Sequence, residues 1–295
     1  MIIIKIMGGL GNQLFQYAYA RALKELGKEV VLDTTTFFNI EAFSPGTTFR
    51  NYFLDKFTIS LKPASKNICT LFSNTGQKNI ALRLINRLKK QFLFRIKHIN
   101  FDTYFLFSPD ALIVSGNTYI SGYFQTEKYF FNIRDILLNE LSLKDGKNTK
   151  IENFPYTNNR GGDNYIAVHI RRGDYVSGGC ALDVEYYLKA FKYIEEKIQT
   201  PVYCIFSDDL NFCMENLKLE NRQYQFINNN REYTDYEELI IMSKCNHHII
   251  ANSSFSWWGA WLCKNPNQIV IAPSRWTETE TENVRDIVPE RWIRL

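Results

Sequence analysis

The feature that most constrains the fold is a local sequence pattern that occurs three times in the second half of the chain. An unbroken apolar run ends in polar residues before helix-forming sequence: "YIAVHI" leads into "RRGDY", "VYCIF" into "SDDLNF", and "HHIIA" into "NSSFSWWGAWL". Continuous apolar runs are typical of parallel strands that helices cover on both faces. A fourth run, "QIVIAPS", follows. We therefore expect an α/β fold whose parallel strands gather these polar residues at their carboxyl ends, where ligands bind.

The beginning of the chain predicts a second sheet. The strand "MIIIKIM", a helix from Asn12 to Lys24 and the strand "EVVLD" form a β-α-β unit. Residues 144–164 are polar, rich in Asn and Gly, and lack apolar periodicity, so we place a domain boundary there. The expected domains are residues 1–150 and residues 151–295, with the C-terminal tail packing back on the first.

Composition excludes several classes of protein. A net charge of +4 on 295 residues is low for a dedicated nucleic-acid binder but leaves room for anionic small ligands. The opening apolar run is too short for a signal peptide, and no run approaches the roughly 20 apolar residues of a membrane span. The six cysteines lack metal-ligand spacing, which favours a reduced, cytoplasmic protein without structural zinc.

One segment, residues 77–99, is cationic on one side and apolar on the other. This pattern indicates an amphipathic helix with a solvated face. The alternative is a peripheral surface that rests on anionic lipid. The two interpretations remain open at this point.

The loop "GGLGNQLFQYA" after the first strand is glycine-rich. Gly9 and Gly11 match part of a dinucleotide-binding fingerprint, and Asp33 ends the second strand, but the third glycine is missing. An NAD-dependent oxidoreductase is therefore one alternative. In the other, backbone amides and the side chains of Asn12 and Gln13 hold an anion or a sugar hydroxyl at a helix N-terminus. The glycines could also serve a tight turn alone.

Two adjacent arginines mark the end of the strand "YIAVHI". His169, Arg171, Arg172 and Asp174 fall within six positions. Guanidinium groups match phosphate oxygens in bidentate fashion and keep their charge. Because side chains alternate along an extended segment, we expect one arginine to face a ligand and the other to pair with an acid. A purely structural ion-pair cluster is the alternative, and His169 is either a ligand contact or a satisfied buried ring.

Acids follow at two further places. Asp208 and Asp209 resemble half of a metal site, but no third ligand lies nearby at a suitable spacing, which favours helix capping and charge balance for the arginines. Asp235, Glu237 and Glu238 open a helix, where the helix dipole accounts for acids. A carboxylate there could also accept hydrogen bonds from guanine.

Hydroxyls gather where the last long helix starts, at Asn252, Ser253, Ser254 and Ser256. They would either face the ligand or cap the helix. The tryptophans that follow at helical spacing, Trp257, Trp258 and Trp261, are predicted to lie in the core.

Taken in order, the segments "GGLGNQLFQYA", "YFLDKF", "ISGYFQTEKYF", "HIRRGDYV", "FSDD", "IIANSSFSWWGAWL" and "APSRW" resemble the α-1,2-fucosyltransferases of glycosyltransferase family 11, most closely the bacterial members. The resemblance covers nearly the whole chain. It implies a GT-B fold, with two Rossmann-like domains facing across a cleft. It also implies inverting, metal-independent transfer of L-fucose from GDP-β-L-fucose to the 2-hydroxyl of a terminal β-galactose, with no cofactor.

The resemblance further implies roles for individual residues. Arg171 would contact the diphosphate, His169 would lie near the guanine, and Asn12 would sit near the reacting centre. The expected catalytic set is Arg171, His169, Asn12 and Asp174. The expected donor-binding set is Gly9, Gly11, Arg172, Asp208, Asp209, Glu238, Asn252, Ser253, Ser254, Phe255 and Ser256.

The catalytic base stays open among His169, Asp174 and a water chain. Gln16 stands where eukaryotic relatives often carry an acid. A non-catalytic module that binds sugar or a lipid surface is the remaining alternative.

Overall fold

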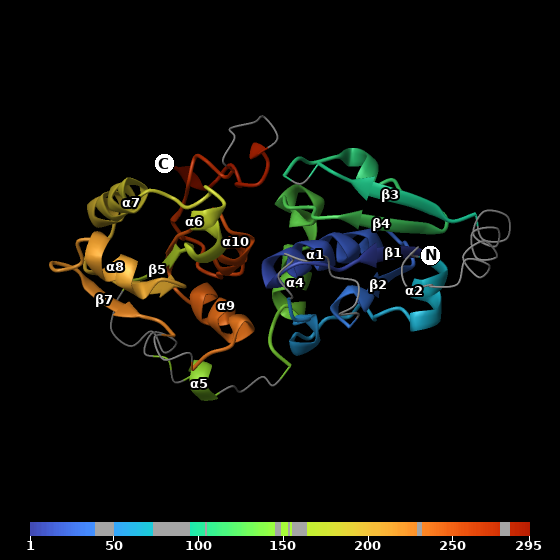
Figure 1. The fold of residues 1–295 in the computed structure, drawn as a ribbon, viewed down its shortest axis with the longest axis horizontal. Helices are drawn as coiled ribbons and strands as arrows, with labels where there is room; N and C mark the ends of the chain where they lie inside the picture. Colours follow the sequence, from blue (N-terminus) through green and yellow to red (C-terminus); the bar gives the residue numbers. More distant parts are fainter. Residues whose placement is uncertain are drawn as a thin grey trace. The chain divides into compact units, whose positions relative to one another are not determined.

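The computed structural model describes residues 1–38, 50–72, 95–103, 105–144, 149–152, 154, 164–228, 232–277 and 284–295. The chain folds as two compact units (Figure 1). Unit 1 comprises Met1–Lys144 and Arg285–Ile287, and unit 2 comprises Asp145–Val284 and Val288–Leu295. Asp286 holds its short segment in unit 1, because its carboxylate pairs with Lys128 at 2.7 Å and accepts a hydrogen bond from the amide of Phe107 at 2.9 Å.

Unit 1 is built on a parallel sheet with the strand order β2-β1-β4-β3. Its strands are β1 (Ile2–Lys5), β2 (Val30–Asp33), β3 (Lys97–Phe101) and β4 (Thr118–Gly122). The described helices of the unit are α1 (Leu10–Glu25), α2 (Lys66–Phe72) and α4 (Arg134–Glu140), with the 3-10 turns η1 (Thr35–Phe37), η3 (Leu54–Lys56), η5 (Pro109–Ala111), η6 (Glu127–Tyr129) and η7 (Phe131–Ile133).

Helix α1 completes the predicted β-α-β unit. It begins after Gly9 and ends at Glu25, so it extends the expected helix at both ends. Every residue from Leu10 to Leu23 except Asn12 is buried. A helix that is buried nearly all round lies inside the protein, and α1 therefore forms part of the core of unit 1.

The basic segment of residues 77–99 falls mostly outside the described residues, which resume at residue 95. Its end is not helical as expected, because Lys97–Phe101 form β3. This strand pairs with β4 in parallel from Lys97↔Thr118 to Phe101↔Gly122. Main-chain pairing with a buried strand therefore overrides the helical periodicity there.

Unit 2 is built on a second parallel sheet, with the strand order β10-β9-β8-β5-β6-β7. Its strands are β5 (Asn164–Ile170), β6 (Pro201–Ser207), β7 (Gln223–Phe226), β8 (His247–Ile249), β9 (Val270–Ala272) and β10 (Ile293–Arg294). Its described helices are α5 (Thr149–Glu152), α6 (Gly173–Ser177), α7 (Val184–Lys197), α8 (Leu210–Asn216), α9 (Asp235–Ser243) and α10 (Ser254–Trp261). The four strands predicted for this half are thus confirmed.

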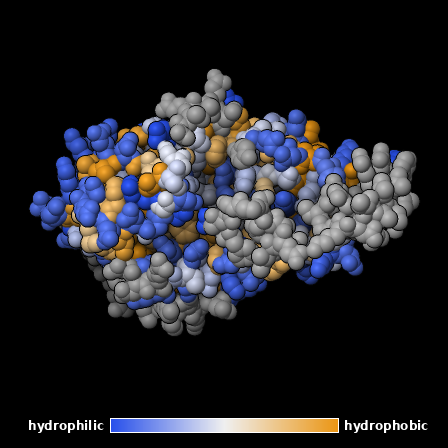
Figure 2. Space-filling model, in the orientation of Figure 1, coloured by the Kyte–Doolittle hydropathy of each residue, from blue (hydrophilic) through white to orange (hydrophobic). Residues whose placement is uncertain are grey.

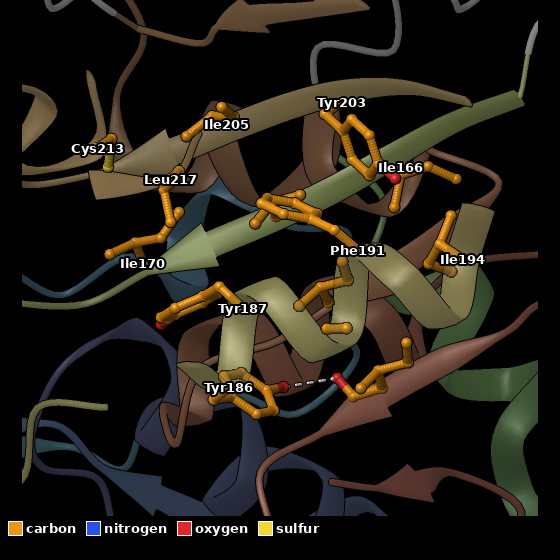
Figure 3. Close-up of a cluster of buried hydrophobic side chains, with 14 of the residues drawn as sticks. Ile166, Ile170, Tyr186, Tyr187, Phe191, Ile194, Tyr203, Ile205, Cys213 and Leu217 are labelled. Carbon is orange, nitrogen blue, oxygen red and sulfur yellow. Dashed lines mark hydrogen bonds between the residues drawn. The ribbon is translucent and has the colours of Figure 1, made fainter. Parts of the chain in front are cut away.

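One apolar cluster joins helix α7 to the sheet of unit 2 (Figure 3). Among its members are Ile166, Ile170, Tyr187, Phe191, Ile194, Tyr203, Ile205, Cys213 and Leu217. The rings of Phe191 and Tyr203 meet edge to face with centroids 4.7 Å apart. Tyr186 donates its hydroxyl to the carbonyl oxygens of Ile250 at 2.7 Å and Ile271 at 3.1 Å. The helix thereby fixes the carboxyl ends of neighbouring strands, where the polar residues follow.

The tryptophans of α10 lie in the core, as predicted. Trp257 and Trp258 are fully buried, and Trp261 is 1% exposed. No described helix has the length and apolar character needed to cross a membrane. On the face of the molecule in Figure 2, hydrophobic residues are scattered between hydrophilic ones.

Candidate functional site

The polar residues at the carboxyl ends of β5 and β6 come together in unit 2. The two strands are paired up to Ile170↔Ser207, so the residues that follow them are neighbours in space. Arg171 Nη1 pairs with Asp208 Oδ2 at 2.7 Å, and Arg171 Nη2 pairs with Asp174 Oδ1 at 2.5 Å. The Arg171 side chain is 27% exposed, so part of it is accessible to solvent.

Arg172 takes different partners from Arg171. Its guanidinium carbon lies 3.5 Å from the centroid of the Phe212 ring, and its Nε pairs with Asp209 Oδ2 at 3.3 Å. Its backbone amide donates to Asp208 Oδ1 at 2.8 Å. Both arginines therefore pair with acids and lie over an aromatic ring, but Arg171 is 5.6 Å from the Tyr175 centroid, whereas Arg172 is stacked more closely, on Phe212. The Arg171 side chain is also slightly more exposed, at 27% against 21%.

The two aspartates after β6 mainly organise this cluster. Asp209 is the N-cap of α8 and accepts a hydrogen bond from the amide of Phe212 at 3.0 Å. Asp208 lies so close to the main chain that a Cβ on Gly173 would stand 2.8 Å from its Oδ2. Among the described residues, no group of three or more His, Cys, Asp or Glu side chains could hold a metal ion.

His169 is a buried ring at the end of β5. It is 7% exposed, and its Nδ1 has no hydrogen-bond partner among the described residues. The ring centroid lies 5.7 Å from that of Phe255 on α10. Burial, together with the charge of Arg171, lowers the pKa of His169 to about 3. The imidazole is therefore neutral near pH 7, with a nitrogen that lacks a protein partner and can serve a ligand.

Asn252 ties three segments together at the end of β8. Its Nδ2 donates to the carbonyl oxygens of Cys180 at 2.9 Å and Trp276 at 3.1 Å, while its backbone carbonyl accepts a hydrogen bond from the hydroxyl of Tyr175 at 3.3 Å. The residue is 5% exposed, and within the described part of the chain its Oδ1 has no partner. Two buried polar atoms, on Asn252 and His169, are thus left for a ligand or for water.

Of the three serines at the start of α10, Ser253 and Ser256 have structural roles and Ser254 is partly exposed. Ser253 is the N-cap and accepts a hydrogen bond from the amide of Phe255 at 3.3 Å. Ser256 is fully buried and donates to the carbonyl oxygens of Ala251 at 3.4 Å and Ser253 at 3.3 Å. Ser254 and Phe255 are partly exposed. Among these side chains, Ser254 and Phe255 are partly accessible to solvent, whereas Ser256 is buried at the start of the helix.

Glu238 lies in the first turn of α9, after a capping box formed by Thr234 and Glu237. Its Oε2 accepts a hydrogen bond from Asn228 Nδ2 at 3.0 Å. Burial raises the pKa of Glu238 to about 7, against the effect of the Asn228 hydrogen bond, and the charges of Asp235 and Asp208 raise it further. Asp208, the smallest of these influences, is also the partner of Arg171.

The glycine-rich loop of unit 1 is held by two glutamine side chains, a role that the sequence does not predict. Gln13 Nε2 donates to the carbonyl oxygens of Asn51 at 2.7 Å and Gly8 at 3.0 Å, and Gln16 Oε1 accepts from the amide of Met7 at 2.9 Å. Both glutamine side chains are fully buried. The Gln13 amide thus shapes the loop and does not reach a ligand. Its distant partner, Asn51, explains why local sequence gave no signal for this role.

Asn12 differs from these glutamines because it is partly exposed. Its Oδ1 accepts a hydrogen bond from Gln125 Nε2 at 2.6 Å. Gly8 has φ of +82°, and a Cβ there would lie 2.8 Å from Asn12 Nδ2, so the turn requires glycine. Gly9 is the N-cap of α1, and Gly11 is buried inside the helix.

The structure disfavours the dinucleotide interpretation of this loop. Asp33, the acid that would bind a ribose, is 1% exposed. It accepts hydrogen bonds from the hydroxyl of Tyr119 at 2.8 Å and from the amide and hydroxyl of Thr35 at 2.9 and 2.6 Å. The carboxylate is therefore already occupied by the protein.

Comparison with known proteins shows the family to which the chain belongs. The pattern of the family described as Glycosyl transferase family 11 matches residues 1–295. Alpha-1,2-colitosyltransferase from Escherichia coli is 30% identical over 306 residues, covering 100% of this chain and 99% of that protein. The O-antigen biosynthesis glycosyltransferase WbnK from Escherichia coli is 31% identical over 312 residues, covering 98% and 99%. Galactoside 2-alpha-L-fucosyltransferase SEC1 from Bos taurus is 26% identical over 152 residues, covering 48% of this chain and 41% of that protein.

Solved structures show the fold. The crystal structure of the fucosyltransferase NodZ from Bradyrhizobium superposes with a TM-score of 0.50 and 13% identity, covering 92% of this chain and 94% of that chain. NodZ alpha-1,6-fucosyltransferase co-crystallized with GDP gives a TM-score of 0.51 and 14% identity, with the same coverage. The predicted fold class is confirmed: the chain is α/β of GT-B type, with a Rossmann-like parallel sheet in each unit.

Proposed function

Because the chain belongs to glycosyltransferase family 11 and is a fucosyltransferase-like glycosyltransferase, we propose that it transfers L-fucose from GDP-β-L-fucose to the 2-hydroxyl of a terminal β-galactose. In this proposal the reaction inverts the anomeric centre and needs no metal ion. The observation that carries the proposal is the partly exposed Arg171 side chain at the carboxyl end of β5, held by Asp174 and Asp208.

Arg171 serves the leaving group in this mechanism. Cleavage of the bond between fucose and the β-phosphate builds negative charge on the phosphate, and a fixed guanidinium stabilises that charge. Asp174 and Asp208 hold the Arg171 side chain in position before the donor arrives. The diphosphate then adds to this network or displaces a carboxylate from it. Arg172, stacked on Phe212, supports the backbone of the turn.

The two buried polar atoms without a protein partner, His169 Nδ1 and Asn252 Oδ1, suit the nucleoside end of the donor. The buried Nδ1 of His169 lacks a protein partner, and we assign it to a hydrogen bond with GDP. A ring whose pKa is lowered to about 3 is a weak proton acceptor at neutral pH, which supports a binding role for His169 over that of catalytic base. Glu238 would accept from the guanine, while Ser253, Ser254 and the start of α10 would meet the phosphates.

Asn12 and Asp174 complete the proposed catalytic set. Asn12, whose amide oxygen accepts a hydrogen bond from Gln125, would orient the sugar. Asp174 is 52% exposed on its side chain and pairs with Arg171. With His169 assigned to binding, Asp174 or a water molecule would take the galactose proton.

A second donor is favoured by one specific observation. The relative that is 30% identical over the whole chain is described as an alpha-1,2-colitosyltransferase. Colitose differs from fucose by lacking the 3-hydroxyl, so the two sugars present the same anomeric chemistry. A donor site that makes no hydrogen bond to the 3-hydroxyl would accept both.

The test supplies both donors to the full-length protein with a panel of galactosides: lactose, N-acetyllactosamine and galactosyl-β-1,3-N-acetylgalactosamine. GDP release and the mass and linkage of the product are measured, with donor alone as the control. We expect an α-1,2-linked product with GDP-fucose. Exclusive use of GDP-colitose would establish the second donor, and binding of GDP-sugars without turnover on any acceptor would favour a non-catalytic module.

A further inference from the structure

Unit 1 exposes an aromatic pair close to the carboxyl end of β2. Phe38, which follows η1, is 73% exposed. Its ring centroid lies 6.3 Å from that of Tyr52, with the planes at 60°. Behind them, the largely buried ring of Phe37 lies 5.5 Å from Tyr52. Because β2 belongs to an open parallel sheet, this pair lies on the side of unit 1 where such sheets bind ligands.

Gln13 fixes the position of Tyr52 from both sides. Its Nε2 donates to the carbonyl of Asn51 at 2.7 Å, and its Oε1 accepts from the amide of Phe53 at 3.0 Å. The same Nε2 donates to the carbonyl of Gly8 at 3.0 Å. One buried side chain therefore joins the segment around Tyr52 to the glycine-rich loop. The main chain on both sides of Tyr52 is therefore fixed before a ligand binds, which lowers the entropy cost of ordering this segment.

The two rings favour a ligand with an apolar face. Burial, and secondarily the charge of Asp55, raise the pKa of Tyr52 to about 12, so the phenol is neutral at pH 7. The Asp55 carboxylate itself pairs with Lys56 Nζ at 3.2 Å. Aromatic rings bind the C–H faces of other groups, and a galactose ring has one face made of C–H groups and an edge of hydroxyls.

We propose that Phe38 and Tyr52 form an acceptor subsite, in which their rings pack against the apolar face of a galactose. The proposal rests on the proposed function, because it names where the galactoside acceptor is held. It concerns residues of unit 1 alone and does not involve the donor-binding candidates of unit 2.

The test compares four variants of the full chain: Phe38→Ala, Tyr52→Ala, Tyr52→Phe and the control Ile113→Ala. Ile113 is a matched control because it lies in the same unit and is also 73% exposed. We expect either alanine substitution at the pair to raise the KM for lactose by roughly five- to tenfold, the effect of losing one aromatic contact. The Kd for GDP and the slow hydrolysis of GDP-fucose without acceptor should stay unchanged. Tyr52→Phe and Ile113→Ala should leave the KM for lactose unchanged.

Binding of lactose in the presence of GDP, followed by saturation-transfer NMR, provides a readout that does not need turnover. If the wild-type protein binds lactose, loses this binding in Phe38→Ala and transfers no sugar, the subsite stands and the proposed function fails. If the wild-type protein transfers fucose and the pair behaves like the Ile113 control, the subsite is wrong and the proposed function stands. An equal effect of Tyr52→Phe and Tyr52→Ala, or no lactose binding by the wild type, also overturns the subsite.

Discussion

Replacing Glu238 by glutamine is expected to remove a pH dependence from the binding of GDP. Burial, aided by the charges of Asp235 and Asp208, raises the pKa of Glu238 to about 7. If its carboxylate accepts hydrogen bonds from guanine, the ionised form binds and the protonated form does not. Among the described residues, Oε1 of Glu238 receives no hydrogen bond, whereas Oε2 is bound by Asn228 at 3.0 Å.

The magnitude follows from the titration. A carboxyl with a pKa of about 7 is roughly one-tenth ionised at pH 6 and roughly nine-tenths ionised at pH 8. The Kd for GDP should therefore fall about tenfold between these pH values, which corresponds to about 1.4 kcal/mol. Glutamine has nearly the same shape and no charge, so Glu238→Gln should lack this tenfold change.

The stability of the ligand-free protein should change with pH in the direction opposite to the affinity for GDP. Because the pKa is raised from the usual 4.5 to about 7, the folded protein holds this proton more tightly than the unfolded chain does. The free energy of unfolding without ligand should fall as pH rises from 4.5 to 7, by up to about 3 kcal/mol. Urea unfolding of the wild type and of Glu238→Gln across this range measures the difference.

The assay is isothermal titration of GDP at several pH values, expressed as the ratio of wild-type Kd to Glu238→Gln Kd. The ratio removes the titration of the GDP phosphate itself, whose pKa is about 6. Glu215→Gln, which removes an exposed acid from α8, is the control for loss of a charge. A ratio that does not change between pH 6 and pH 8, or wild-type binding that is tighter at pH 6, would refute the assignment.

Three further predictions concern the loop and the arginine cluster. Arg171→Ala should lower kcat/KM for transfer by at least about 100-fold with an unchanged circular dichroism spectrum, because the leaving phosphate loses its cation; near-normal turnover would defeat the role. Gly8→Ala should lower the free energy of unfolding by about 1–2 kcal/mol in urea, because φ is +82° and the new Cβ would meet Asn12, whereas Gly9→Ala meets nothing within 4 Å and should stay within about 0.5 kcal/mol. Transfer should persist in EDTA; a loss that Mg²⁺ or Mn²⁺ restores would instead make Asp208 part of a metal site.

The sequence predicted the strands that helices bury on both faces. The apolar runs that became β1, β2, β5, β6, β8 and β9 are recognisable because a doubly covered parallel strand must be apolar along its whole length. Three strands that it missed, β3, β7 and β10, lie at sheet edges. An edge strand needs less apolar sequence, since main-chain hydrogen bonds to its neighbour hold it. The interior strand β4 was missed because its short run, Thr118–Gly122, contains threonine, serine and glycine.

The sequence by itself therefore determined the α/β class, the family likeness and the strand ends at which polar residues stand. Only the tertiary structure decided which partners these residues take: Arg171 with Asp208, Asn12 with Gln125, and Gln13 with the segment around Tyr52. The physical reason is that residue type and periodicity are local properties of the chain. Contacts between residues 37 to 113 positions apart depend instead on strand order, register and the paths of the loops, which are set only when the whole core packs.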